Sequence, residues 1–127
     1  MKSKILTIIA TVIFSSGAFA HGHEKHTSQK EELITGELIG MTCFIKHASK
    51  GPEHADCFKE CAQKGLPIGI LTKEDKIYQI SGDGHADLKS ENQKFLKYAG
   101  ESVAAKGEIF TRGGMQMIVV KAIKKAQ

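Results

Sequence analysis

The feature that most constrains the fold is the N-terminal segment, because its pattern leaves only a small chain to form a domain. Two lysines precede an apolar run from Ile5 to Phe14, and Ala18-Phe19-Ala20 follows with the small residues of a signal-peptide cleavage point. The run is shorter than the roughly 20 apolar residues that a stable membrane anchor needs. We therefore expect residues 1–20 to be a secretory signal peptide, cleaved after Ala20 on export to the bacterial periplasm. An uncleaved membrane anchor is the alternative.

Removing 20 of the 127 residues leaves 107, which is enough for one domain. The signal holds two lysines and no acidic residue, so the net charge falls from +4 to +2. A charge this small does not indicate binding to nucleic acid or to a membrane surface. Aromatic residues, which stack on single-stranded bases, make up only 6 % of the chain. We expect no nucleic-acid partner and no membrane contact after cleavage.

Residues 21–32 (HGHEKHTSQKEE) contain no apolar residue and are predicted to form a disordered, histidine-rich arm before a domain at 33–127. Cleavage after Ala20 would place His21-Gly22-His23 at a free amino terminus. A histidine in third position lets the terminal amine, two backbone amides and the imidazole bind Cu(II) or Ni(II) in a square plane. We predict that His21 and His23 bind metal; a simple polar spacer is the alternative.

The domain alternates short apolar runs with turns rich in glycine and polar residues. Two helices are predicted, at Glu53–Lys64 and Asn92–Ala99, each closed by a glycine. The predicted strands are Thr35–Ile45, Pro67–Leu71, Ile77–Ile80, Val103–Thr111 and Met115–Ile123. This order predicts a mainly β (α+β) fold, an OB-like five-stranded barrel with one helix and a short helical insertion between strands 1 and 2. Another α+β arrangement of the same elements is the alternative.

The three cysteines, Cys43, Cys57 and Cys61, lie within 19 residues of one another, together with His47 and His54. On a helix, His54, Cys57 and Cys61 would project from one face. Cys43 is predicted at the end of the first strand, on a loop that can fold back over that face. Soft thiolate ligands favour Cu(I) or Zn(II). We predict a metal site of Cys43, His54, Cys57 and Cys61, with His47 as a further ligand.

A disulfide is the competing interpretation, because exported proteins meet an oxidising compartment. Cys43 paired with Cys57 or Cys61 would leave one spare thiol. The domain would then be a thiol-disulfide protein, or a disulfide-stapled binding module for a peptide or protein partner. We expect no enzymatic activity, because the sequence contains neither a nucleophile elbow nor a phosphate-binding loop.

Two resemblances bear on this region. Cys57-Phe58-Lys59-Glu60-Cys61 resembles the paired cysteines of binuclear copper sites in oxidase subunits and of the proteins that deliver copper to them, although Gly65 stands where the oxidase site has histidine. A longer pattern, from Gly36-Glu37-Leu38 through Thr42-Cys43-Phe44 and Lys50–Cys57 to Leu71, is similar to small exported bacterial OB-fold-like proteins with a Cys/His-rich helical insertion. The first resemblance implies copper chemistry, and the second implies an OB-like fold with a cysteine-centred site.

Together these patterns predict a periplasmic metal-binding protein for copper or zinc. Its ligands would come from the Cys/His cluster and the histidine-rich arm. Its partners would be the metal ion and another periplasmic protein.

Overall fold

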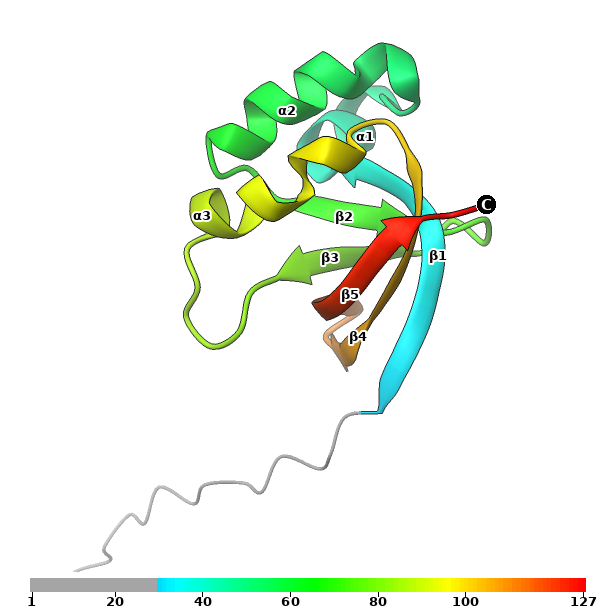
Figure 1. Cartoon of the computed structure of the whole chain (residues 1–127), viewed down its shortest axis with the longest axis vertical. Coiled ribbons are helices and arrows are strands. Elements are labelled where there is room, and N and C mark those ends of the chain that lie inside the picture. Colours follow the sequence, from blue (N-terminus) through cyan, green and yellow to red (C-terminus); the bar gives the residue numbers. More distant parts are fainter. Residues whose placement is uncertain (1–29) are drawn as a thin grey trace, which may run out of the picture.

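The computed structural model describes residues 30–127, so the predicted signal peptide and residues 21–29 of the arm lie outside the described residues. The fold is mixed α+β with five strands, as predicted (Figure 1). The first strand, Glu31–Gly40, begins two residues before residue 33, the predicted start of the domain. The elements are β1 (Glu31–Gly40), α1 (Met41–His47), the 3₁₀ turn η1 (Pro52–His54), α2 (Ala55–Gln63), β2 (Ile68–Leu71), β3 (Ile77–Ser81), α3 (Leu88–Asn92), the 3₁₀ helix η2 (Gln93–Tyr98), β4 (Ser102–Arg112) and β5 (Met115–Lys125).

The five strands pair in the order β1-β2-β3-β5-β4, and β4 pairs again with β1. All pairs are antiparallel except β3 with β5, which is parallel. Each strand therefore has a neighbour on both sides, and the described sheet leaves no long unpaired edge of the kind that promotes aggregation.

β1 changes partner at a bend around Gly36. Its first part pairs with β4 as far as Glu37, and its last part, from Glu37 to Gly40, pairs with β2. A Cβ atom on Gly36 would lie 2.3 Å from the carbonyl oxygen of Leu71. Only glycine permits this approach of two backbones.

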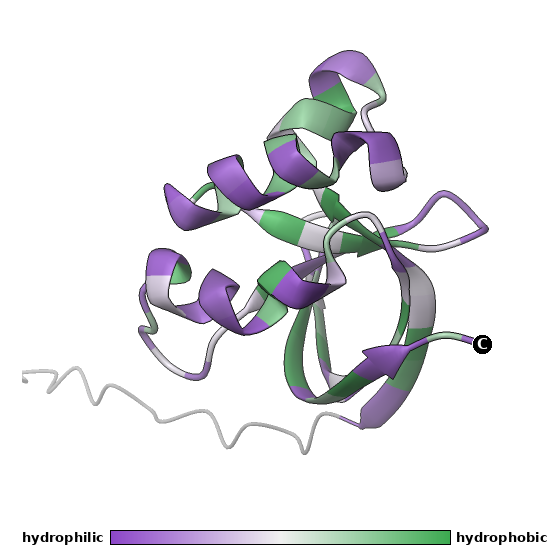
Figure 2. Cartoon of the chain, turned by 45° about the horizontal axis from the view of Figure 1, so that its top comes forward, coloured by the Kyte–Doolittle hydropathy of each residue, from purple (hydrophilic) through white to green (hydrophobic). Residues whose placement is uncertain are grey.

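The core lies inside the ring of strands and beneath the helices. Hydrophobic residues concentrate on the strands, whereas the turns and the outer faces of the helices are hydrophilic (Figure 2). The largest fully buried apolar side chains are Leu38, Ile39, Ile68, Ile70, Ile80, Val103 and Ile118. All of them come from strands, so the sheet supplies the interior on which the helices pack.

The helices gather at one end of the sheet (Figure 1). α2 buries Phe58 and Ala62, which are one turn apart on its inner face. The segment α3–η2 buries Asn92, Phe95 and Tyr98, a spacing of three that matches the three residues per turn of a 3₁₀ helix. No helix among residues 30–127 has the length and apolar character needed to cross a membrane.

The prediction that the first strand extends to Ile45 is wrong, because β1 ends at Gly40 and residues 41–47 form α1. β2 is only four residues long, and its pairing with β1 ends at the pair Gly40–Ile68. Beyond this point β1 has no strand to pair with. The backbone groups that follow find partners within a helix instead, as buried or half-buried backbone groups must.

The helix predicted at Glu53–Lys64 is also divided, into η1 and α2, and α2 begins at Ala55. Gly65 closes it with a positive φ of 83°, as expected. The helix predicted at Asn92–Ala99 begins earlier, at Leu88, where the Asp87 side chain accepts bonds from the backbone N–H groups of Lys89 and Ser90. The remaining four strands lie within two residues of their predicted bounds.

Candidate metal centre

The three cysteines meet where α1 packs beside α2. The Sγ atom of Cys43, on α1, lies 3.7 Å from Sγ of Cys57 and 3.8 Å from Sγ of Cys61, both on α2. All three sulfur atoms lie within 4.8 Å of one another, and all three residues are free thiols. This group can hold a metal ion.

The positions of Cys57 and Cys61 follow from the way α2 is anchored. Each cysteine immediately precedes a residue of the buried face, Phe58 or Ala62. Successive helical residues are about 100° apart, so both sulfurs lie on the flank of α2 beside the core rather than within it. The end of α2 is held by Asn92, whose Nδ2 donates to the carbonyl oxygens of Ala62 and Leu66 at 3.0 and 2.9 Å.

The position of Cys43 depends on the short helix α1. At its start, Met41 is buried and its backbone N–H donates to the Pro67 carbonyl at 3.0 Å. At its end, Ala48 adopts a left-handed conformation and its N–H donates to the carbonyl of Phe44 at 2.7 Å. α1 is therefore fixed mainly at its two ends, with Cys43 between them.

The loop between α1 and α2 is held against the sheet. The backbone N–H of Gly51 donates to the Glu37 carboxylate on β1. Gly100 has a φ of 71°, and a Cβ atom there would lie 2.8 Å from Cα of Pro52. This close approach fixes the start of η1, and hence the direction in which α2 leaves the loop.

The two histidines predicted near the cysteines do not belong to the group of mutually close ligand atoms among the described residues. His47 is exposed at the last position of α1. His54 precedes α2 instead of lying on it, so the expected one-face spacing with Cys57 does not apply. His21 and His23 lie outside the described residues.

A narrow crevice lies beside the cluster. It is lined by Cys43, Cys57 and His54 among others, and its volume is about 10 Å³. A single water molecule needs roughly 10–15 Å³ measured in this way. The crevice therefore has room for about one species of the size of a water molecule or an ion.

The cluster also changes the acidity of one thiol. Burial, followed by the hydrogen bonds and charges of Cys57 and Cys61, raises the pKa of the Cys43 thiol to about 11. Cys43 therefore carries its proton at neutral pH. A metal ion that binds this sulfur must displace that proton, so binding releases protons and is weakened by acid.

The spacing of the sulfurs suits an ion shared by all three. Metal–thiolate bonds are about 2.3 Å long, so three sulfurs around one ion in a plane would be about 4.0 Å apart. The two distances to Cys43 are 3.7 and 3.8 Å. The donor set therefore needs only small movements to bind an ion.

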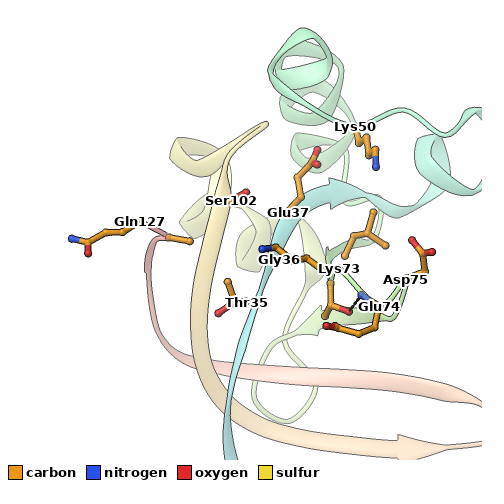
Figure 3. Close-up of a pocket in the computed structure, with 12 residues that line it drawn as sticks. Thr35, Gly36, Glu37, Lys50, Lys73, Glu74, Asp75, Ser102 and Gln127 are labelled. Carbon is orange, nitrogen blue, oxygen red and sulfur yellow. Dashed lines mark hydrogen bonds between the residues drawn. The ribbon is translucent and has the colours of Figure 1, made fainter.

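A second pocket, of about 500 Å³, contains none of the cysteines. It lies between β1 and the turn that joins β2 to β3 (Figure 3). Lysines and acidic residues both line it: Lys50, Lys73, Glu37, Glu74 and Asp75. These mixed charges select no class of ligand.

Fold and site together define a small α+β domain in which α1 and α2, between β1 and β2, bring three thiols together near the surface. Comparison of the chain with protein-family models, with curated proteins and with solved structures found no match.

Proposed function

We propose that this protein is a non-enzymatic, copper-binding protein of the bacterial periplasm, in which Cys43, Cys57 and Cys61 hold one Cu(I) ion. The observation that carries the proposal is the convergence of three free thiols within 4.8 Å beside a crevice of single-ion size. Two separate helices, α1 and α2, supply these sulfurs, so the geometry of a single helix does not account for the cluster.

Copper is favoured over zinc by the number of ligands. Structural zinc sites are almost always four-coordinate, with four protein ligands. The described residues bring together three, all sulfur, and soft thiolates select Cu(I). Zinc is the second metal that suits these ligands, and a direct comparison of the two ions distinguishes them.

The periplasmic location rests on the signal-peptide pattern of residues 1–20. We further propose that the ring of strands is an OB-type barrel, which the closed pairing order and the placement of α3–η2 between β3 and β4 support. The insertion that bears the cysteines then occupies a loop from which OB folds bind ligands. The histidine-rich arm, with His21 and His23, would capture Cu(II) separately.

The test is a titration of the fully reduced protein with Cu(I) under argon, followed by native mass spectrometry and by the thiolate-to-copper charge-transfer absorption. We expect one ion per chain. Replacing any one cysteine by serine should weaken binding more than about 100-fold, which exceeds the effect of losing an outer hydrogen-bond partner of a metal ligand.

His47→Ala is the matched control, because this exposed residue ends α1 without joining the sulfur group. Its affinity for Cu(I) should equal that of the unaltered chain. If the reduced protein takes up no Cu(I), the function is refuted. If it binds Zn(II) more tightly than Cu(I) relative to matched thiol chelators, the assignment of copper is refuted.

A further inference from the structure

We propose that the three-cysteine cluster is a redox-gated metal site, in which a disulfide oxidant joins Cys43 to Cys57 and releases the bound Cu(I). This inference rests on the proposed function, because it concerns the regulation of the same site. The inference goes beyond the proposed function in two respects: it names the condition under which the protein releases the metal, and it names the pair of sulfurs that controls the release.

Cys43 is common to both disulfides that the cluster can form. Its sulfur lies 3.7 Å from that of Cys57 and 3.8 Å from that of Cys61. Cys57 and Cys61 are one turn apart on α2, and a bond between them would distort the helix. Any disulfide therefore removes Cys43 and one further thiolate from the metal site. Metal binding and oxidation are mutually exclusive.

The two helices differ in how firmly they are held. α2 is anchored by two buried side chains, Phe58 and Ala62. α1 has seven residues, of which only Met41 is buried, and Ile45 on the same helix is 68 % exposed. A disulfide needs a sulfur–sulfur distance of about 2.05 Å, so Cys43 must approach Cys57 by roughly 1.7 Å. The shorter and less buried α1 is the element that moves.

Exposure selects Cys57 as the sulfur that reacts first. Cys57 is exposed, whereas Cys43 and Cys61 are partly buried. The Cys57 thiolate attacks a small disulfide, forms a mixed disulfide with one half of it, and releases the other half as a thiolate. Cys43 gives its proton to the thiolate released in the first step, and its sulfur then attacks Sγ of Cys57 and displaces the second half as a thiolate, which takes up the proton that Cys57 had lost. Two protein thiols are oxidised, and one oxidant disulfide is reduced to two thiols.

After this reaction the cluster retains one free thiol, that of Cys61. A single thiolate cannot replace three, so the Cu(I) ion passes to another soft ligand. Bound metal has the opposite effect on the cysteines. An ion shared by Cys43 and Cys57 occupies the sulfur electrons that the exchange requires, so the loaded protein resists oxidation.

The experiment treats the full chain, reduced and free of metal or loaded with one equivalent of Cu(I), with oxidised glutathione under argon. Trypsin then separates the three cysteines, because Lys46, Lys59 and Lys64 end the peptides that contain them. We expect a Cys43–Cys57 peptide pair from the metal-free protein. Its oxidised form should bind Cu(I) at least tenfold more weakly, and the loaded protein should oxidise at least tenfold more slowly.

Two variants serve as matched controls. Cys61→Ser should form the same disulfide at a similar rate, whereas Cys43→Ser should form none within a chain. The inference is overturned by a Cys57–Cys61 disulfide, by Cys43–Cys61 as the main product, or by an oxidised chain that binds Cu(I) as tightly as the reduced one. Failure of the proposed function is seen separately, as a reduced and untreated chain that takes up no Cu(I).

Discussion

Asn92 offers the sharpest test of how the helical region is held together. It is the one fully buried polar side chain among the described residues, at 0 % exposure. Its Nδ2 donates to two carbonyl oxygens where α2 ends, those of Ala62 and Leu66. Its Oδ1 has no hydrogen-bond partner among the described residues. The side chain therefore contributes through its two donors.

Replacing Asn92 by alanine removes both bonds. Each is worth about 0.5–1.5 kcal/mol net, so the expected loss of unfolding free energy is about 2 kcal/mol. The Ala62 carbonyl also accepts from the backbone N–H of Gly65, so the Leu66 carbonyl is the group more fully deprived. A loss of this size lowers Tm by about 8–16 °C in a domain of roughly 100 residues.

Asn92→Asp has the same shape but opposite chemistry, since it turns a carboxylate oxygen toward two carbonyls and buries a charge. It should destabilise the protein more than alanine does. Urea unfolding followed by circular dichroism measures both variants, with exposed Gln93→Ala as a control expected within about 0.5 kcal/mol of the unaltered protein. An Asn92→Asp variant as stable as Asn92→Ala would refute the assignment of the two donors.

Further expectations concern the bend, the anchor of α2, the α3 cap and the metal. Gly36→Ala should markedly lower the denaturant midpoint, because its Cβ would lie 2.3 Å from a carbonyl oxygen of β2. Phe58→Ala should lower the unfolding free energy in urea by about 3–5 kcal/mol, as for other buried aromatic residues. Hydrogen bonds from Ser90 and from the backbone lower the pKa of Asp87 in the folded protein. The stabilising effect of the Asp87 carboxylate is therefore complete above the pKa that this group has in the unfolded chain, and it is lost as the pH falls through the lower pKa of the folded protein. Asp87→Asn should reduce the change in Tm between about pH 6 and pH 3. Free Cu(I) at 100 times its Kd should stabilise the protein by about 2.7 kcal/mol, seen as a rise in Tm.

Local patterns were sufficient to predict most of the strands. The hairpin between β2 and β3 has short apolar runs and a polar turn, and Thr72 and Lys76 close it through their backbone groups. The parallel pairing of β3 with β5 has no such signal, because it joins segments separated by α3, η2 and β4. Pairings of this kind are decided by the whole fold.

The error at α1 has a definite cause. Residues 41–45, Met-Thr-Cys-Phe-Ile, are mostly apolar and include two β-branched residues, which favours a strand when they are read alone. The deciding fact, that β2 is too short to pair with them, lies more than 20 residues away. A local signal was available for His54, because Gly51-Pro52 precedes it and proline favours the first position of a helical turn. That signal predicts a short turn that contains His54 and precedes the helix that bears Cys57.

Asn92 was missed for a related reason, since a polar residue next to a turn is ordinarily expected to face solvent. Its spacing of three from Phe95 and Tyr98 was the available clue, because in a 3₁₀ helix such residues share a face. With the α-helical period of about 100° per residue, Asn92 and Tyr98 lie about 120° apart, so that period gives a weaker clue.

The structure explains why the chain has an odd number of cysteines. Three thiols are one more than a single disulfide uses, and one fewer than the four ligands of a closed zinc site. The geometry accounts for the number, because Cys43 is close to both partners and can share either a metal with two thiolates or a bond with one. A purely structural disulfide would require only two of these cysteines, and the third thiol would then gain nothing from lying within 4.8 Å of both. Cys61 is therefore the discriminating residue: replacing it by serine should leave the disulfide and its rate of formation intact while it weakens the binding of Cu(I).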